Sequence, residues 1–341
     1  MFKTILFTHD DLDGAGCRII FQLAHEDLQK GIDYEVYNCS NFNVDEIVKS
    51  VIRSDSVDEN TRICFGDIVA SRDILEEIAA KFKNVNIWDH HRTNFFAEHI
   101  ISNATIIPEN TFGQLQSGTS IMYQYFSDVG SKDKTLKCFK DSYQWSFLLS
   151  KFVDCIRSYD TYEWKETNNI EAKKLQTLFI LLGMENFCKR YIDKFLSAYT
   201  HDAGLISIND LDFVNAKLER EQSIIDKFDI IDIHIIDLYG LKIGLLCKDM
   251  MVNISELSYQ FLSKYPDIDV LATFSLADEG AWQFRTVKDD IDIGKIIAAP
   301  IGGGGHPKAA GAPLPQGFKD LLLELLKFYL NPDDHRNIYI E

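Results

Sequence analysis

The chain has 341 residues, 46% of them apolar, with 35 basic and 52 acidic side chains that give a net charge of −17. This length allows two globular domains, and no apolar run approaches the roughly 20 residues that a membrane-spanning helix requires. An acidic surface disfavours long polyanions, because sequence-independent nucleic-acid binding depends on Lys and Arg that neutralise many phosphates. Bound cations can reverse the charge locally, so the balance favours small phosphorylated substrates over long duplexes.

Neither the amino terminus nor the cysteines indicate secretion. The segment Met1–Phe7 has too short an apolar stretch for a signal peptide and is soon followed by acidic residues. The seven cysteines are an odd number and include no C-x-x-C pair, which argues against a disulfide framework and a structural zinc site. We therefore expect a cytoplasmic protein that does not enter the membrane. Its oligomeric state stays open, with a homodimer as one option.

The first half of the chain alternates between short apolar runs and segments with helical spacing. Strands are predicted at Lys3–Thr8, Asp33–Tyr37, Arg62–Phe65 and Val85–Trp88, and helices at Cys17–Gln29, Val44–Val51 and Ile74–Phe82. The apolar runs are typical of parallel strands that are buried on both faces. This alternation predicts an α/β domain built on a doubly wound parallel sheet.

Three of these four strands end in clusters of Asp and His. The carboxyl ends of strands in an open α/β sheet line the crevice where ligands bind, so these clusters are expected at one edge. The candidate set is His9, Asp11, Asp13, Asp67, Asp89, His90 and His91. Crowded carboxylates repel one another unless a cation lies among them, and oxygen and imidazole ligands without thiolates suit Mn²⁺ or Mg²⁺. Asp also caps turns and helix starts, so each residue alone is weak evidence, but the combination predicts a binuclear metal site.

The second half of the chain has two different patterns. Thr111–Thr200 is predicted to be rich in helices, with a helix start at Ser117–Ser120, and its many aromatic residues are expected to lie in the core. Val214–Phe228 has helical spacing and is expected to connect two domains. Beyond it, strands at Ile233–Ile236, Lys242–Cys247, Val270–Leu276 and Trp282–Val287 predict two hairpins, with a helix at Ser255–Lys264 between them. A smaller α+β domain is therefore expected at the carboxyl-terminal end.

A glycine-rich segment, Gly302–Gly305, precedes His306 and Pro307. It is predicted to be a loop that leads into a helix, because Pro favours the first turn of a helix. Successive N–H groups in such a loop could hold an anion, whereas the adjacent Ala309–Gly311 needs only close packing to explain it. The candidate substrate-binding set is Arg285, Gly303, Gly304, Gly305, His306 and Lys308.

Several of these motifs resemble those of the DHH–DHHA1 phosphoesterases. The matching segments, in chain order, are Asp11–Gly14, Gly66–Asp67, Asp89–His91, residues 153–161 and Gly302–Gly311. The first four are similar to motifs of the family's metal-binding domain, and the last is similar to the glycine-rich motif of its DHHA1 domain. In the fourth motif Asp160 is the matching residue and Asp154 the alternative. The segments occur in the expected order and cover almost the whole chain.

The resemblance implies two Mn²⁺ ions, with Mg²⁺ as the alternative, held by Asp11, Asp13, Asp67, His90 and Asp160. Asp67 would bridge both ions, and His91 and Asp89 would be the catalytic residues. His91 would lie beside the scissile phosphate, to donate to a non-bridging oxygen or to protonate the leaving oxygen. Where many members carry a His four residues before the D-x-D pair, this chain has Phe7, and His9 is an additional candidate ligand.

The resemblance also implies a division of the chain and a function. Residues 1–205 would form the catalytic domain, 206–230 a helical linker and 231–341 a substrate-binding domain that closes over the metals. The implied activity is hydrolysis of short oligoribonucleotides to mononucleotides, as in nano-RNases, by water that two metal ions activate. Short DNA oligomers and dinucleotides are further candidate substrates.

Two other enzymatic functions need the same metals and stay open. One is a phosphatase for 3′,5′-bisphosphorylated adenosine, and the other is a phosphodiesterase for cyclic or linear dinucleotides. A third hypothesis, from another class, is a nucleotide-binding sensor whose metal site has lost activity. The complete set of metal-ligating residues argues against the sensor.

Overall fold

The computed structural model describes residues 3–26, 33–129, 143–197, 204–238, 240–246, 252–275, 281–315, 317–318 and 320–321. The chain divides into two compact units, Met1–Ala216 and Lys217–Glu341. The division lies inside helix α8 (Ile208–Ile225), in the segment that the sequence predicts as a connector. The first unit is built on a parallel sheet and the second on a mixed sheet, so the predicted fold class is confirmed.

The sheet of the first unit has five parallel strands in the order β2-β1-β3-β4-β5. The strands are β1 (Thr4–His9), β2 (Tyr34–Cys39), β3 (Arg62–Gly66), β4 (Asn84–Asp89) and β5 (Ala104–Ile106). The sequence predicts the first four of these and misses the short β5. In β1, the side chains from Ile5 to Phe7 are fully buried, as expected for a parallel strand with both faces covered.

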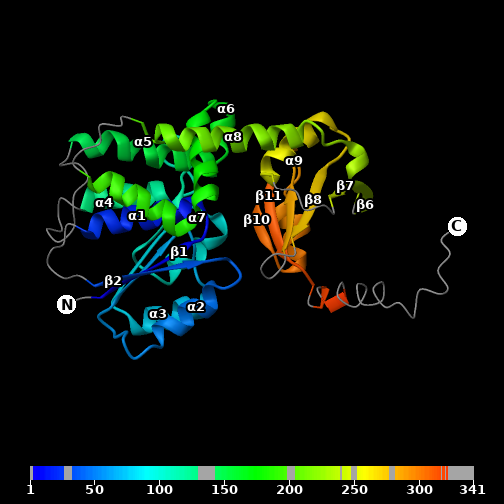
Figure 1. Cartoon of the computed structure of the whole chain (residues 1–341). Helices are drawn as coiled ribbons and strands as arrows, with labels where there is room; N and C mark the ends of the chain where they lie inside the picture. Colours follow the sequence, from blue (N-terminus) through cyan, green and yellow to red (C-terminus); the bar gives the residue numbers. More distant parts are fainter. Residues whose placement is uncertain are drawn as a thin grey trace, which may run out of the picture. The chain divides into compact units, whose positions relative to one another are not determined.

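Helices cover both faces of this sheet (Figure 1). Helices α2 (Val44–Ile52) and α3 (Arg72–Lys81) lie on one face and pack with the sheet in one apolar cluster that includes Val48, Phe65 and Ile78. The other face carries α1 (Leu12–Glu26), α4 (Gly118–Val129), α5 (Tyr143–Asp160) and α7 (Ile170–Leu196). The short α6 (Glu163–Glu166) and the 3₁₀ segment η1 (Arg92–His99) complete the unit.

Helix α1 begins at Leu12, five residues before the predicted start at Cys17 (17 − 12 = 5). The reason is local, because the carboxylate of Asp11 accepts a hydrogen bond from the backbone N–H of Gly14 at 2.9 Å. An Asp that accepts from the first turn in this way is a favourable helix start. The Asp-x-Asp-Gly motif therefore forms the start of a helix, and Asp13 lies in its first turn.

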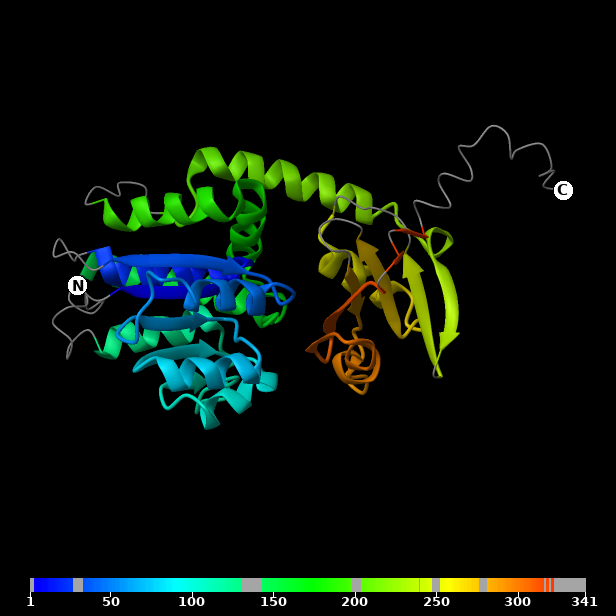
Figure 2. The same ribbon diagram turned by 90° about the horizontal axis from the view of Figure 1, so that it is seen from below.

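The second unit has a six-stranded sheet in the order β10-β11-β9-β8-β7-β6 (Figure 2). Its strands are β6 (His234–Leu238), β7 (Leu241–Leu246), β8 (Val270–Ser275), β9 (Ala281–Arg285), β10 (Gly304–His306) and β11 (Ala309–Pro313). Helix α9 (Ile254–Lys264) connects the parallel pair β7 and β8. Three short helical segments, η3 (Ile230–Asp232), η4 (Gly294–Ala298) and η5 (Ala299–Ile301), lie at its borders.

Both predicted hairpins are present, since β6 pairs antiparallel with β7 and β8 with β9. Cys247 and Leu276, the last residues of two predicted strands, lie outside the described residues. Among the residues that the structure describes, no helix is both long and apolar enough to cross a membrane. The five described cysteines are buried and free.

The prediction for the glycine-rich segment is wrong. Residues 302–307 do not lead into a helix, because Gly304–His306 forms strand β10 and turns back into β11. Pro307 occupies the turn, where its missing N–H costs no ladder hydrogen bond. An alanine Cβ at Gly303 would lie 2.1 Å from the carbonyl oxygen of Gly311, so close packing between backbones explains this glycine.

Candidate metal centre

The predicted ligands meet at the carboxyl edge of the first sheet. In the strand register Thr8 lies beside Gly66 and Gly66 lies beside Trp88, so the residues that follow these strands emerge next to one another. Three overlapping groups bring ligand atoms within 4.8 Å of one another: His9, Asp11 and Asp67; Asp13, His90 and Asp160; and Asp67, Asp89, His90 and His91. These groups contain all eight predicted ligands and catalytic residues of this unit.

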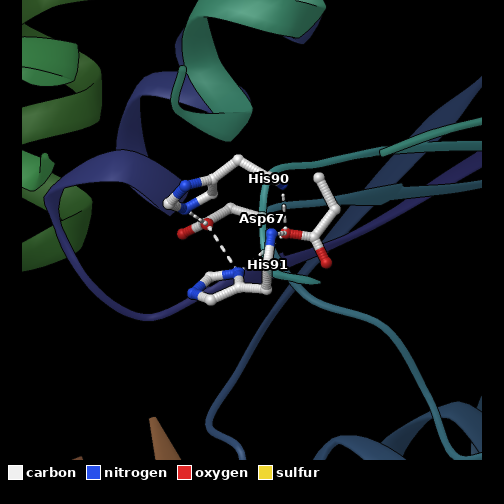
Figure 3. Close-up of side chains that lie close together, drawn as sticks. Asp67, His90 and His91 are labelled. Carbon is white, nitrogen blue, oxygen red and sulfur yellow. Dashed lines mark hydrogen bonds and ion pairs between the residues drawn. The ribbon is translucent and has the colours of Figure 1, made fainter. Parts of the chain in front are cut away.

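Asp67 is at the centre of the cluster. Its Oδ2 lies 3.8 Å from Nδ1 of His9, while its Oδ1 lies 3.3 Å from Nε2 of His90 and 3.8 Å from Nδ1 of His91. Figure 3 shows both imidazole rings facing this carboxylate. The backbone of Asp67 has a positive φ of 60°, a conformation that is unfavourable for residues other than Gly and is characteristic of functional sites. The two oxygens of one carboxylate thus face two different sets of ligands.

His9 and Asp11 form one of those sets. Nδ1 of His9 lies 2.7 Å from Oδ2 of Asp11. The amide of Asn41, in the turn after β2, lies 3.4 Å from the other ring nitrogen of His9. His9 is the last residue of β1, so the strand itself directs the ring to the edge. The structure therefore brings His9 into one cluster with the residues that the resemblance implies as ligands.

Asp13 is buried and is fixed by the start of α4. Its Oδ2 accepts a hydrogen bond from the backbone N–H of Gly118 at 2.6 Å, and its Oδ1 accepts one from Thr119 at 3.0 Å. The hydroxyl of Thr119 also donates to the backbone carbonyl of Asp13 at 2.7 Å. N–H groups at a helix start are suited to oxygen acceptors, so α4 fixes the Asp13 side chain in one orientation.

Asp89 supports its neighbours through hydrogen bonds. Oδ1 accepts from the backbone N–H groups of His90 at 2.7 Å and His91 at 3.2 Å, and it lies 2.8 Å from Nδ1 of the His91 ring. Oδ2 accepts from the side-chain amide of Asn94 at 2.5 Å. With both oxygens engaged and the residue fully buried, Asp89 is built to orient His91.

The fourth motif contributes Asp160 to the cluster. Oδ2 of Asp160, at the end of α5, lies 3.3 Å from Nε2 of His90. Asp154, the alternative, instead forms an ion pair with Arg157 at 2.8 Å. Arg157 also pairs with Glu163 at 2.6 Å, so Asp154 belongs to a structural network beside the cluster.

The electrostatics of the cluster are those of crowded and buried carboxylates. Burial raises the pKa values of Asp67 and Asp160 well above the usual range, and the carboxylates of Asp13 and Asp11 raise them further. Burial would lower the pKa of His9, but Asp11 outweighs it and raises that pKa to about 9. For Asp67 and Asp160, repulsion between neighbouring carboxylates favours the protonated form, whereas for His9 the attraction to Asp11 does so.

The other members of the cluster respond to their hydrogen bonds and ion pairs. Burial alone would raise the pKa values of Asp11 and Asp89, but His9 and His91 respectively hold them well below the usual range. Burial would lower the pKa of His91, whereas Asp89 raises it to about 9. Burial and the neighbouring His91 lower the pKa of His90, which favours the neutral imidazole that a metal requires.

The donor set fits divalent cations. Two buried carboxylate oxygens of the cluster have no hydrogen-bond partner within the described part of the chain: Oδ1 of Asp67 and Oδ2 of Asp160. Buried polar atoms are rarely left without partners unless an ion or a function accounts for them. Carboxylate and imidazole donors without a thiolate suit Mn²⁺ or Mg²⁺. Cations would satisfy these atoms and remove the repulsion between the carboxylates.

The candidate substrate-binding residues of the second unit lie together on its sheet. Arg285 pairs with Ala309, which in turn pairs with His306. Residues directly opposite each other in an antiparallel pair share a face, so Arg285 and His306 lie on one face with only Ala309 between them. Lys308 is in the adjoining turn and forms an ion pair with Asp289 at 2.5 Å.

The glycines of this segment have different explanations. Gly305 has a φ of 136°, and a Cβ on it would lie 2.6 Å from the carbonyl oxygen of Ala309, so the hairpin requires a glycine there. Gly303 is required by close packing, as described above. At Gly304 an added Cβ would meet nothing within 4 Å. Among these glycines, therefore, only Gly304 is left without a structural explanation.

Sequence reasoning missed the residues that hold the ligands in place. Gly118 and Thr119 were visible only as a helix start, because nothing in the sequence connects that helix to Asp13. Asn94, which donates to Asp89, and Asn41, which contacts His9, follow strand ends by a few residues. Their position in the sequence could have identified them, because polar residues just beyond the ends of parallel strands lie at the same edge of the sheet.

Comparison with known proteins finds a relative that aligns with nearly the whole chain. No family model matches the chain. An oligoribonuclease, NrnB of Bacillus subtilis, is 28% identical over 347 residues, which cover 98% of this chain and 79% of the relative.

Solved structures share the fold at low sequence identity. RecJ from Thermus thermophilus in complex with Mn²⁺ has a TM-score of 0.54 at 12% identity, covering 96% of this chain and 52% of RecJ. The chain thus spans about half the length of that protein. A pGpG-specific phosphodiesterase, PggH of Vibrio cholerae, has a TM-score of 0.50 at 13% identity, covering 98% of this chain and 100% of PggH. The motif resemblance is borne out to this extent: the chain shares the fold of RecJ and PggH and aligns over nearly its whole length with an oligoribonuclease.

Proposed function

We propose that this protein is a metal-dependent phosphodiesterase that hydrolyses short oligoribonucleotides to mononucleotides. Two divalent cations, Mn²⁺ or Mg²⁺, would be held at the carboxyl edge of the first sheet. Full-length similarity to an oligoribonuclease supports the hydrolase class and the type of substrate. The net charge of −17 favours short substrates over long ones.

The position of the Asp67 carboxylate carries this proposal. One oxygen faces His9 and Asp11, and the other faces His90, which lies beside Asp13 and Asp160. A carboxylate between two sets of ligands is the arrangement expected for a bridging ligand in a two-metal site. Such a pair of ions lowers the pKa of a bound water and stabilises charge on the phosphoryl oxygens. No nucleophilic side chain is then needed.

The chain's own residues would orient the substrate. Asp89 accepts the hydrogen on Nδ1 of His91, which leaves Nε2 of the same ring available to a phosphate oxygen. The side chain of His91 is one-third exposed, at 33%, so a substrate can reach it. We assign to His91 the donation of a hydrogen bond or a proton to that oxygen.

We propose that Arg285 and His306, with Lys308, bind the nucleotide next to the cleaved bond. Their shared face on the second sheet supports this assignment. His306→Ala should raise KM for a dinucleotide and leave the Mn²⁺ content unchanged, because His306 belongs to a different unit from the metal ligands. Loss of metal in this variant would contradict the assignment.

The metal site can be tested with a matched pair of aspartates on α5. Asp160→Asn should weaken Mn²⁺ binding by at least about tenfold, since it removes an anionic ligand. Asp154→Asn should leave Mn²⁺ binding unchanged, because Asp154 pairs with Arg157 instead. Calorimetric titration of both variants with Mn²⁺ measures the difference, and equal affinities would remove Asp160 from the ligand set.

Product analysis tests the substrate. The protein would be incubated with Mn²⁺ and one substrate at a time. The substrates are an RNA of about five nucleotides, a linear dinucleotide, a cyclic dinucleotide and 3′,5′-bisphosphorylated adenosine. Mononucleotides from the 5-mer are the expected result. Exclusive turnover of a dinucleotide or of the bisphosphate would replace the proposal with the corresponding alternative. Nucleotide binding without turnover would indicate a sensor.

A further inference from the structure

The loop between β5 and α4, residues 107–117, connects two parts of the metal centre. At one end the backbone N–H of Ile107 donates to the carbonyl oxygen of Asp89 at 2.9 Å. At the other end the backbone N–H of Gly118 donates to the carboxylate of Asp13 at 2.6 Å. Both ends of the loop are therefore fixed at the edge of the sheet where the candidate ligands meet.

The loop is held in one conformation by its own hydrogen bonds. Glu109 and Leu115 form a β-bridge, and the backbone N–H of Asn110 donates to the carbonyl oxygen of Gln114 at 2.9 Å. The side chain of Asn110 accepts from the backbone N–H groups of Phe112 at 2.9 Å and of Gln114 at 3.1 Å. The result is a small, ordered hairpin with Phe112 at its tip.

The base of the hairpin is anchored to the helical layer. The guanidinium of Arg157 donates to the carbonyl oxygen of Leu115 at 3.1 Å, and Arg157 itself is buried. The backbone N–H of Gln116 donates to the carbonyl oxygen of Pro108 at 2.9 Å. This anchoring keeps the tip from folding back onto the body of the unit.

Phe112 is 93% exposed, the most exposed of the large apolar side chains that the structure describes. The aromatic residues of this region are expected in the core, and Phe126, Phe152 and Tyr191 are indeed buried there. Phe112 departs from that expectation. An ordered loop that keeps a phenyl ring in water gains nothing for folding, because burial of that ring would be favourable. The ring is therefore available to a ligand.

The position and chemistry of the ring fit a nucleobase. The chain from Ile107 to Phe112 can extend at most about 17 Å, or about 3.3 Å per residue, so Phe112 stays near the metal edge. Between residues 107 and 117 the only charged residue is Glu109, in a protein whose net charge is −17. An acidic protein gains little from phosphate contacts outside its metal site, whereas stacking of bases on aromatic rings needs no positive charge.

We propose that Phe112 is a substrate-positioning residue whose ring stacks on a base of the oligonucleotide being cleaved. This inference rests on the proposed function and adds a binding contact to it. The ring would hold the strand while the phosphodiester bond lies at the metals. Because stacking does not depend on the identity of the base, the contact would increase affinity for an oligomer without selecting a sequence.

Substitution of Phe112 tests this role. Phe112→Ala should raise KM for an RNA 5-mer (about five nucleotides) at least about fivefold, equivalent to about 1 kcal/mol. kcat and the affinity for Mn²⁺ should stay unchanged, because Phe112 is not a ligand. Phe112→Trp and Phe112→Tyr should restore KM. An unchanged KM, or a lower kcat at unchanged KM, would overturn the proposal.

Phe147→Ala is the matched control. Phe147 is also exposed, at 74%, and it lies near the opposite end of α5 from Asp160. At about 1.5 Å per residue, about 20 Å of helix separates it from the metal edge. This control should behave as the unsubstituted protein. A rise in KM equal to that of Phe112→Ala would mean that exposed rings act nonspecifically, and would overturn the assignment.

Oligomers that lack one base identify the stacked position. In a series of RNA oligomers of about five nucleotides, each oligomer would lack one base at a different position. For one of these oligomers, Phe112→Ala should no longer raise KM. An equal rise in KM for every oligomer of the series would contradict stacking.

Binding separates this inference from the proposed function. The affinity of the protein for a fluorescently labelled RNA of about five nucleotides is measured by fluorescence anisotropy, with Ca²⁺ in place of Mn²⁺. If the protein binds the oligomer through Phe112 but does not cleave it with Mn²⁺, the stacking role stands and the proposed function fails. If it cleaves the oligomer and Phe112→Ala binds as the unsubstituted protein does, only the inference fails. If it neither binds nor cleaves the oligomer, both fail.

Discussion

At the scale of single residues, Asp89 differs from the other carboxylates of the metal centre. Asp67 and Asp160 each have a buried oxygen without a hydrogen-bond partner among the described residues. Both oxygens of Asp89, in contrast, accept hydrogen bonds, and one of these fixes the ring of His91. Partners of this kind orient a functional imidazole and set which ring nitrogen carries the proton.

Asp89→Asn should therefore damage catalysis more than metal binding. We expect kcat to fall by about 10- to 100-fold, the range typical for such supporting partners, while the Mn²⁺ stoichiometry stays unchanged. Steady-state kinetics and metal analysis on the same preparation measure both effects. Loss of a Mn²⁺ ion from the variant would show instead that Asp89 is itself a ligand.

The protonation of the cluster gives a prediction about pH. Among the candidate ligands, Asp67 and Asp160 have raised pKa values, and that of His9 is raised to about 9. Protons on these groups compete with a cation for the same ligand atoms, and ligation must displace them. The affinity for Mn²⁺ should therefore rise from pH about 6 to about 8.

Calorimetric titrations of Mn²⁺ in two buffers with different ionisation enthalpies should then report a net release of protons. Asp160→Asn should release fewer protons than the unsubstituted protein, because it lacks one of the protonated groups. An affinity for Mn²⁺ that is independent of pH would contradict the assignment of these residues as ligands.

At the scale of elements, the start of α4 is the part of the scaffold on which the metal centre most depends. Gly118 donates to Asp13, and a Cβ added to Gly118 would lie 2.7 Å from Cβ of Asp67 and 2.9 Å from its Cα. There is thus no room for a side chain between α4 and the residue proposed to bridge the ions.

Gly118→Ala should move α4 or Asp67 and weaken Mn²⁺ binding by at least about tenfold, with a lower melting temperature. Gly304→Ala is the control, because a Cβ there meets nothing within 4 Å. Calorimetry with Mn²⁺ and thermal unfolding measure the two effects. If Gly118→Ala binds Mn²⁺ as the unsubstituted protein does, the contact between α4 and the metal centre is less important than its geometry indicates.

The strands and helices also show which features of the site the sequence predicts and which it does not. Strands β1, β3 and β4 are largely apolar runs with polar ends, and this local pattern is sufficient to place His9, Asp67 and Asp89 at one edge. The contact between α4 and Asp13 joins residues 105 positions apart and has no local signal. The choice between Asp154 and Asp160 likewise required the structure, because both lie on α5 and only packing determines which one faces His90.

The hairpin of β10 and β11 was mispredicted for a similar reason. Glycine is unfavourable in strands, so a run of glycines before Pro307 reads as a loop before a helix. Its pairing with β9 overrides this preference, because the glycines let β10 approach β11 closely. Tertiary pairing of this kind is not visible in local propensities.

At the scale of the whole molecule, the net charge of −17 bears on the length of the proposed substrate. The sequence predicts the order of the two units well, because parallel-sheet and hairpin patterns differ over long stretches. The net charge acts over the whole surface, so the rate of cleavage should depend on substrate length and on salt concentration.

Cleavage should accordingly slow as oligomers lengthen. With Mn²⁺ supplied, kcat/KM for an RNA of about 50 nucleotides should be lower than for one of about 5, because the acidic surface repels the additional phosphates. Added monovalent salt screens this repulsion, so it should raise the rate for the long oligomer and leave that for the short one nearly unchanged. Steady-state rates at two salt concentrations measure both effects. Equal rates for the two lengths would contradict the electrostatic argument, and a slow long oligomer that is insensitive to salt would indicate a steric limit at the site instead.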